Sequence, residues 1–117
     1  MNKFVLMATL SALTLVAAGA QADVVGNPAA ARGKVSMCIG CHGIVDNRTA
    51  FPEVYHVPKL GGQNAQYLAD SLHAYQKLDR KFQTMHAIAV SLSEQDIADI
   101  AAYYAAQTPS SPNNPDK

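Results

Sequence analysis

The chain has 117 residues, of which 49% are hydrophobic and 15% charged. This length has room for one small domain, so it excludes a multidomain enzyme. Lysine and arginine together number 9, and so do aspartate and glutamate. No basic segment stands apart from the rest, so the charge pattern gives no support to a nucleic-acid-binding or an anionic-membrane-binding function.

Residues 1–22 have the features of an export signal. Lys3 supplies a positive charge, residues 4–18 form an apolar run, and Ala20-Gln21-Ala22 has the small-X-small form that signal peptidase cuts. The alternative is an uncleaved anchor, but the run is shorter than the roughly 20 apolar residues of a membrane-spanning helix. We predict cleavage after Ala22 and a periplasmic mature chain without stable membrane insertion, in which acidic side chains outnumber basic ones by one.

The residues after the leader predict a helix followed by a long loop. Asn27 followed by Pro28 is typical of a helix start, because asparagine caps free amide groups and proline suits the first helical position. A first helix is therefore expected over about 28–38. Residues 43–62 contain Pro52, Pro58 and several turn-formers and predict an ordered loop without long regular structure. A loop of that length in a small domain usually wraps a ligand or serves a function.

Three further helical segments are expected downstream. An amphipathic helix is predicted over about 64–77, and a short turn of helix over about 85–91. Ser93 and Asp96 form a capping pattern that opens a last helix, which runs to about residue 107. The apolar stripes of the two longer helices consist of Ala65, Leu68, Leu72 and Tyr75, and of Ile97, Ile100, Ala101 and Tyr104.

The expected fold is all-α, with three main helices, a short helix and a long loop in one domain over residues 23–107. No segment alternates for long enough to predict a strand. The tail over residues 108–117 is rich in proline, serine and asparagine and is expected to be disordered. Because the apolar stripes are narrow and the domain is small, its helices leave a central gap that a flat apolar cofactor could fill.

The segment Cys38-Ile39-Gly40-Cys41-His42 is the pattern of c-type haem attachment. Two thiols three positions apart lie about one helical turn from each other, so each can form a thioether with one of the two vinyl groups of a haem. The histidine that follows then places its imidazole beneath the iron. The motif predicts one covalently attached haem.

Three other uses of the cysteines compete with haem attachment. A thioredoxin-like Cys-X-X-Cys needs a βαβ context that this chain lacks. A structural zinc site needs four ligands, and His56, His73 and His86 are scattered along the chain. A disulfide would close a loop too short to restrict the unfolded chain much, and it would explain neither His42 nor the long loop.

The second axial ligand decides the function of a haem protein, because an open position binds gases or peroxide and a filled one favours electron transfer. After the leader the chain has two methionines, of which Met37 is tied to the attachment side by the neighbouring cysteine. Met85 lies beyond the second predicted helix and can reach across. His86 is the serious competitor, because it is adjacent to Met85. His73 is expected to be solvated, and His56 to lie on the attachment side.

Several segments occur at the spacing of a known family. They are residues 38–43, Pro58-Lys59-Leu60-Gly61-Gly62-Gln63, Tyr67, Leu72, Arg80, Met85, Leu92 and residues 96–104. On these residues the chain resembles a class I cytochrome c over about 28–107, and it is most similar to the small bacterial cytochromes c553 and to one half of cytochrome c4. The attachment motif is specific, and the proline and methionine segments are moderately so.

The resemblance implies a set of haem contacts. Cys38 and Cys41 carry the haem, His42 is the proximal iron ligand and Met85 the distal one. The carbonyl of Pro58 is expected to accept the other imidazole N–H of His42 and so to fix the orientation of the ring.

The resemblance also assigns roles to less specific residues. The pair Gly61-Gly62 would let the backbone pass close to the haem ring, and Arg80 would neutralise a haem propionate, unless it is simply solvated. Relatives commonly have glycine after the second helix, where this chain has Leu78. The first helix is short before the cysteines, and its contact with the last helix is expected near Gly33 and Tyr104.

The function implied by the resemblance is that of a single-haem electron carrier between two redox proteins, which transforms no substrate. Near-zero net charge predicts short-lived docking through a modest apolar patch, with weak salt dependence. One alternative is a haem sensor or peroxidase-like protein with an open or displaceable sixth site, in which His86 is the candidate acid–base group. Another is a haem subunit of a dehydrogenase or oxidase complex.

Overall fold

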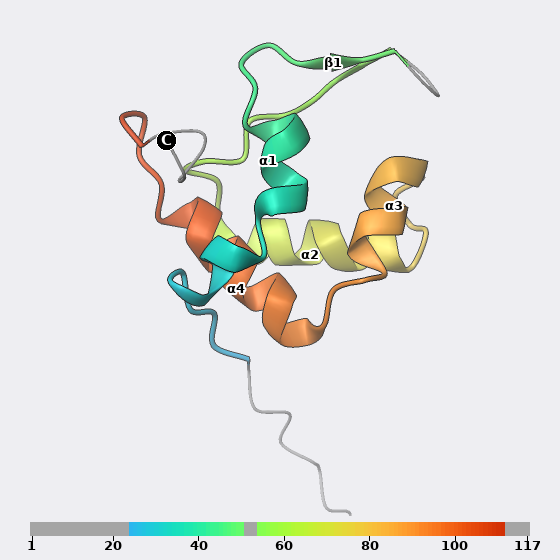
Figure 1. The fold of residues 1–117 in the computed structure, drawn as a ribbon. Coiled ribbons are helices and arrows are strands. Elements are labelled where there is room, and N and C mark those ends of the chain that lie inside the picture. The colour runs from blue at the N-terminus through green and yellow to red at the C-terminus, as the bar shows by residue number, and fades with distance from the viewer. Residues whose placement is uncertain (1–23, 51–53, 112–117) are drawn as a thin grey trace, which may run out of the picture.

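The structure is a computed structural model that describes residues 24–50 and 54–111 (Figure 1). The elements in chain order are the 3-10 helix η1 (Ala30–Gly33), α1 (Ser36–His42), the strands β1 (Arg48–Thr49) and β2 (Tyr55–His56), α2 (Ala65–Gln76), α3 (Gln83–Ala89) and α4 (Glu94–Ala105). The predicted leader and the end of the predicted tail lie outside the described residues. Within the described ranges, no helix is both long and apolar enough to cross a membrane.

The core forms where α4 packs on α2 and on η1, and α3 packs on α2 near its C-terminal end (Figure 1). Both long helices turn their apolar stripes toward this contact. The buried side chains of the core are Ala31, Val35, Leu68, Ile100, Ala101 and Tyr104. The predicted all-α fold is therefore confirmed.

Side-chain caps fix the starts of the two longest helices. The Asn64 side chain accepts the amide of Tyr67 at 3.0 Å and so caps α2. At α4, the Ser93 hydroxyl accepts the amide of Asp96 at 3.2 Å, and the Asp96 carboxylate accepts the amide of Ser93 at 3.0 Å. The predicted capping pattern is confirmed, and it satisfies amide groups that have no partner inside the helix.

The first helix differs from the prediction over residues 28–38. The chain forms η1, then a turn, then α1, which continues through both cysteines to His42. The Asn27 side chain accepts the amide of Ala29 at 3.0 Å, so it caps a local turn rather than an α-helix. The break between η1 and α1 allows Ala31 and Val35 to lie fully buried in the same cluster as α4. That constraint comes from a distant segment, so local capping signals do not predict it.

A second difference lies in the predicted loop over residues 43–62. The strands β1 and β2 form an antiparallel pair, in which Arg48 lies opposite His56 and Thr49 opposite Tyr55. The pair forms a hairpin that extends away from the helices (Figure 1). Strands of two residues are too short to show alternation, which is why no strand was predicted.

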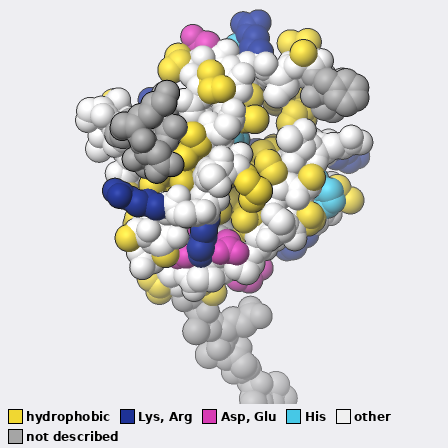
Figure 2. Space-filling model, viewed as in Figure 1, with side chains coloured by type: hydrophobic (Ala, Val, Ile, Leu, Met, Phe, Trp, Pro, Cys, Tyr) yellow, Lys and Arg dark blue, Asp and Glu magenta, His cyan; other side chains and the backbone are white. Residues whose placement is uncertain are grey.

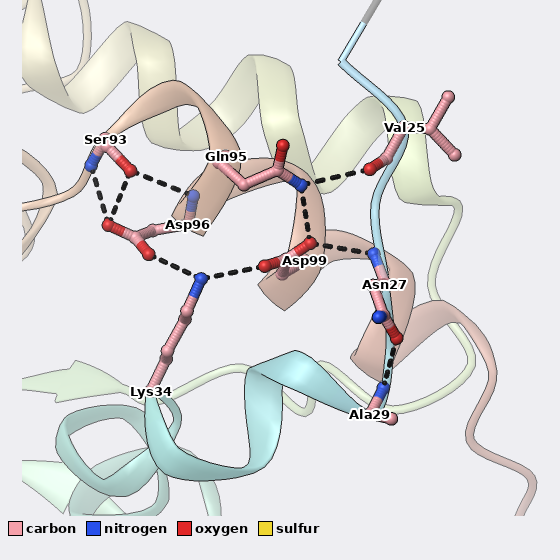
Figure 3. Close-up of polar contacts among 8 residues, drawn as sticks. All are labelled: Val25, Asn27, Ala29, Lys34, Ser93, Gln95, Asp96 and Asp99. Carbon is pink, nitrogen blue, oxygen red and sulfur yellow. Dashed lines mark hydrogen bonds and ion pairs between the residues drawn. The ribbon is translucent and has the colours of Figure 1, made fainter.

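A polar network ties the segment before α1 to α4 (Figure 3). Asp99, on α4, is 2% exposed, and its carboxylate accepts from the Asn27 amide at 2.7 Å and from the Gln95 side chain at 2.8 Å. The ammonium of Lys34 lies 2.7 Å from the carboxylates of both Asp99 and Asp96. These contacts, above all the one with Lys34, lower the pKa of Asp99 to about 2. The network sets the path by which the chain enters α1.

The backbone at Gly26 lies directly against α4. A Cβ at this position would lie 2.7 Å from the carbonyl carbon of Ala98 and 2.9 Å from the Cβ of Ala102. At Gly33 an added Cβ would meet nothing within 4 Å. The expected contact of the first helix with the last near Gly33 and Tyr104 is confirmed for η1, whose Ala31 shares the core cluster with Tyr104, and Gly26 meets α4 still earlier in the chain.

We expect Gly26→Ala to lower the free energy of unfolding by about 1–3 kcal/mol, because the new methyl group overlaps α4 backbone. Gly33→Ala is the matched control, since it adds the same group into open space. It should leave the stability unchanged or raise it by up to about 1 kcal/mol. Thermal unfolding of the two variants measures the difference, and equal melting temperatures would show that Gly26 does not pack on α4.

Candidate functional site

An apolar cavity of about 360 Å³ lies between α1, α2, α3 and the segment after β2. In the space-filling view, hydrophobic side chains gather around a hollow at the middle of the face shown (Figure 2). Cys38, Cys41 and His42 line the cavity from α1, and Met85 lines it from α3. Its apolar wall includes Leu60, Leu68, Leu72, Phe82, Ile88, Leu92 and Ile100. The helices thus leave a central gap with the attachment motif on its wall.

His42 ends α1 and is held in one orientation by the segment after β2. Its Nδ1 atom donates to the carbonyl oxygen of Pro58 at 2.7 Å, so the hydrogen bond expected between these residues is present. Burial lowers the pKa of His42, and the hydrogen bond to Pro58 opposes that change only in part. A neutral imidazole protonated at Nδ1 has its lone pair on Nε2, which is the form that binds a metal ion.

The two cysteines are free thiols one helical turn apart, and they form no disulfide. Burial raises the pKa of the Cys38 thiol. The Tyr104 hydroxyl is buried beside it, and the Cys38 thiol is its one neighbour for hydrogen bonding among the described residues. A thiol is a weak partner, so a stronger acceptor brought into the cavity would satisfy this hydroxyl better. This wall therefore fits a group that is attached through the thiols and fills the cavity.

Met85 and His86 are neighbours in α3 but have different surroundings. Met85 lines the cavity and His86 does not. The Nδ1 atom of His86 instead donates to the carbonyl oxygen of Tyr75 at 2.7 Å. His56 lines the cavity from β2 and is exposed. The described residues hold no group of three or more histidine, cysteine, aspartate or glutamate side chains placed to hold a metal ion.

Two cationic side chains, Arg80 and Lys59, line the cavity, and no aspartate or glutamate is among its described lining residues. The Arg80 guanidinium donates to the Tyr67 hydroxyl at 3.2 Å and lies 5.4 Å from the centroid of the Tyr75 ring. Its positive charge has no carboxylate partner among the described residues. Such a pair of cations suits a ligand with carboxylate groups, as the propionates of haem are. Sequence reasoning missed the aromatic support of Arg80, because Tyr75 fits an apolar stripe equally well.

Gly61 and Gly62 are not among the residues that line the cavity, although Leu60 and Gln63 on either side of them are. Gly62 has a φ of 81°, and its amide donates to the carbonyl of Tyr104 at 2.9 Å. It therefore joins the cavity wall to the end of α4, in a conformation that favours glycine. Leu78, at the end of α2, has a φ of 63°, the left-handed conformation for which glycine is the usual residue. The turn toward Met85 therefore contains a residue in a strained conformation.

Comparison with known proteins identifies the family. Residues 30–106 match the family model described as Cytochrome c. The chain belongs to the cytochrome c family. It is 44% identical over 85 residues to cytochrome c-554(548) of Halomonas halodenitrificans, and the aligned segment covers 70% of this chain and 98% of that protein. It is 38% identical over 86 residues to cytochrome c4 of Pseudomonas aeruginosa, and the aligned segment covers 74% of this chain and 41% of that protein.

A solved structure supports the same assignment. The crystal structure of reduced recombinant cytochrome c4 from Pseudomonas stutzeri matches with a TM-score of 0.58 at 35% identity, and covers 72% of this chain and 47% of that chain. This cytochrome c therefore spans nearly all of cytochrome c-554(548) and less than half of these cytochromes c4. The family resemblance read from the sequence is confirmed. As a cytochrome c, the protein carries covalently attached haem c and serves electron transfer.

Proposed function

We propose that this cytochrome c is a periplasmic electron carrier with a single haem, attached through Cys38 and Cys41, with His42 and Met85 as the iron ligands. The observation that carries the proposal is the cavity, on whose wall these four residues meet although they come from α1 and α3. The haem supplies a one-electron couple at its iron when it is bound.

Two protein ligands allow the electron to arrive and leave with little rearrangement. The Pro58 carbonyl holds the ring of His42, and α3 presents Met85 to the same cavity, so neither side chain has to be exchanged. The thioether sulfur of Met85 favours ferrous iron, and the apolar lining acts in the same direction because it excludes water. Arg80 and Lys59 would hold the propionates at the rim.

Electron transfer needs a haem edge that a partner protein can approach, and three exposed residues on the cavity wall would surround such an edge. The lining residues Met37, Tyr55 and Tyr67 are 49%, 53% and 50% exposed. They give a modest apolar rim for transient contact with a redox protein. Because acidic side chains outnumber basic ones by just one after removal of residues 1–22, we expect the rate of electron transfer to depend weakly on salt.

The proposal assigns three parts to the chain. Residues 1–22 are a signal peptide removed on export, residues 23–107 are the haem domain, and residues 108–117 are a tail outside it. The apolar run before the small-X-small segment supports the first assignment. Within the tail, the amide of Ser111 donates to the carbonyl of Thr108 at 2.9 Å, so a turn follows α4.

The test is the mass and the visible spectrum of the full chain, expressed with its leader in a host that attaches haem in the periplasm. We expect the mass of residues 23–117 plus one haem, and a ferric spectrum with the far-red absorption that marks a methionine–iron bond. A mass without haem would overturn the proposal. Absence of that absorption, with rapid carbon monoxide binding to the ferrous form, would favour a sensor or peroxidase-like protein. Purification in a stable complex would favour a subunit of a larger enzyme.

A further inference from the structure

The helix that carries Met85 is short and buries little of its own surface. It spans Gln83–Ala89, its first turn has no side-chain cap, and Ala89 is its one buried residue. A helix of this length is unstable by itself in water, because the cost of nucleation is spread over too few hydrogen bonds. The position of α3, and of Met85 on it, therefore depends on contacts with other elements.

Gln76, the last residue of α2, makes two of these contacts. Its Nε2 atom donates to the carbonyl of Ala89 at 2.9 Å and to the carbonyl of Leu92 at 3.0 Å. The Ala89 carbonyl also accepts the amide of Leu92 at 3.1 Å, and the Leu92 carbonyl lies beyond the last turn of α3. One side-chain amide thus joins α2 to the last turn of α3 and to the turn that leads into α4.

The orientation of this amide is determined by its partners. The two carbonyl oxygens can only accept, so they require the Nε2 atom of Gln76 and leave Oε1 as an acceptor. The Nδ1 atom of His73 lies 3.2 Å from this oxygen and must therefore carry a hydrogen. The Nε2 atom of His73 lies 3.4 Å from the Glu94 carboxylate. His73 is thus half-buried and partnered, contrary to the expectation that it is solvated, and it holds the Gln76 amide in place.

A second contact joins α3 to the same end of α2. The Nδ1 atom of His86 donates to the carbonyl of Tyr75, the residue before Gln76. The contacts at His86 and Ala89 are one helical turn apart on α3, and Met85 directly precedes the first of them. If the Gln76 amide is lost, the hydrogen bond from His86 to Tyr75 is the one of these side-chain contacts that still joins α3 to α2.

We propose that Gln76 is the positioning residue for the distal iron ligand, because its amide holds α3 on α2 and so keeps Met85 in the cavity. This inference rests on the proposed ligation by Met85. Without the amide, the Leu92 carbonyl loses this donor and the Ala89 carbonyl keeps the Leu92 amide but loses its link to α2, so α3 leaves α2 more often. Met85 then spends a larger fraction of the time away from the iron, and an external ligand competes more easily.

The experiment compares imidazole binding to the ferric holoprotein in wild type and in Gln76→Met, which keeps the length of the side chain and removes its donors. We expect the variant to bind imidazole about ten-fold or more tightly, because the competent state is more populated. Gln66→Met is the matched control. Gln66 also lies on α2 and donates to Asp70 at 2.8 Å on the exposed surface, so its loss should leave imidazole binding unchanged.

A purely structural role of Gln76 predicts a different outcome. Binding is measured well below the melting temperature, so that global unfolding does not contribute. A lower melting temperature with imidazole binding as in wild type would overturn the inference. Gln76→Asn, which keeps the amide and shortens its reach, provides a milder variant if Gln76→Met folds poorly, and it is expected to show a smaller change in the same direction. A wild-type protein without the methionine–iron absorption would overturn the ligation itself, and the inference with it.

Discussion

Met85→Ala is expected to leave the haem covalently attached and to open its iron to external ligands. The attachment residues on α1 are untouched, whereas an alanine on α3 is too short to reach the iron. The far-red absorption of the methionine–iron bond should disappear. The ferric protein should bind imidazole at least about 100-fold more tightly than wild type, because no internal ligand has to be displaced first. The reduction potential should fall, since thioether sulfur favours ferrous iron.

Met37→Ala is the matched control for this prediction. Met37 also lines the cavity, but it lies on α1 next to Cys38 and is 49% exposed. The variant should keep the absorption band and the wild-type affinity for imidazole. A Met85→Ala protein with an unchanged six-coordinate spectrum would contradict the proposed ligand set. His86 would then be the first alternative, and its contact with the Tyr75 carbonyl would have to break.

Asp99→Asn is expected to lower the stability at neutral pH and to remove part of the acid sensitivity of the fold. The buried carboxylate accepts from Lys34, Asn27 and Gln95, and these contacts lower its pKa from 3.8 to about 2. A group whose pKa is lower in the folded state stabilises it fully above the unfolded value, and this contribution is lost as the pH falls through the folded value. The melting temperatures of wild type and variant should therefore differ most above about pH 5 and converge between about pH 4 and pH 2.

The measurement is thermal unfolding of the holoprotein from pH 7 down to pH 2. Some acid sensitivity remains in the variant, because Lys34 and Ser93 hold the pKa of Asp96 well below its usual range. Asp70→Asn is the control, since this carboxylate lies exposed on α2 and accepts from the Gln66 side chain. A difference between wild type and Asp99→Asn that stays constant down to pH 2 would show that the Asp99 charge does not stabilise the fold.

The sequence by itself determined the cofactor chemistry and the long helices, because both are decided over a few neighbouring residues. Cys38, Cys41 and His42 lie within two helical turns, so their spacing carries the attachment geometry whatever surrounds them. The capping pair of Ser93 and Asp96 is equally local, as are the apolar stripes that predict α2 and α4. The central gap followed from the narrowness of those stripes.

Only the tertiary structure decided which of two adjacent side chains faces that gap. Met85 and His86 are neighbours in the sequence, so their positions along the chain do not show which of them faces the cavity. That depends on how α3 is rotated about its axis by its contacts with Tyr75 and Gln76 of α2. The break between η1 and α1 has the same kind of cause, since it follows from packing on α4. These features depend on residues that are far apart in the chain and meet only after folding. Periodicity and capping describe a residue's neighbours along the chain, so they predict helices but not the direction in which a short helix turns its side chains.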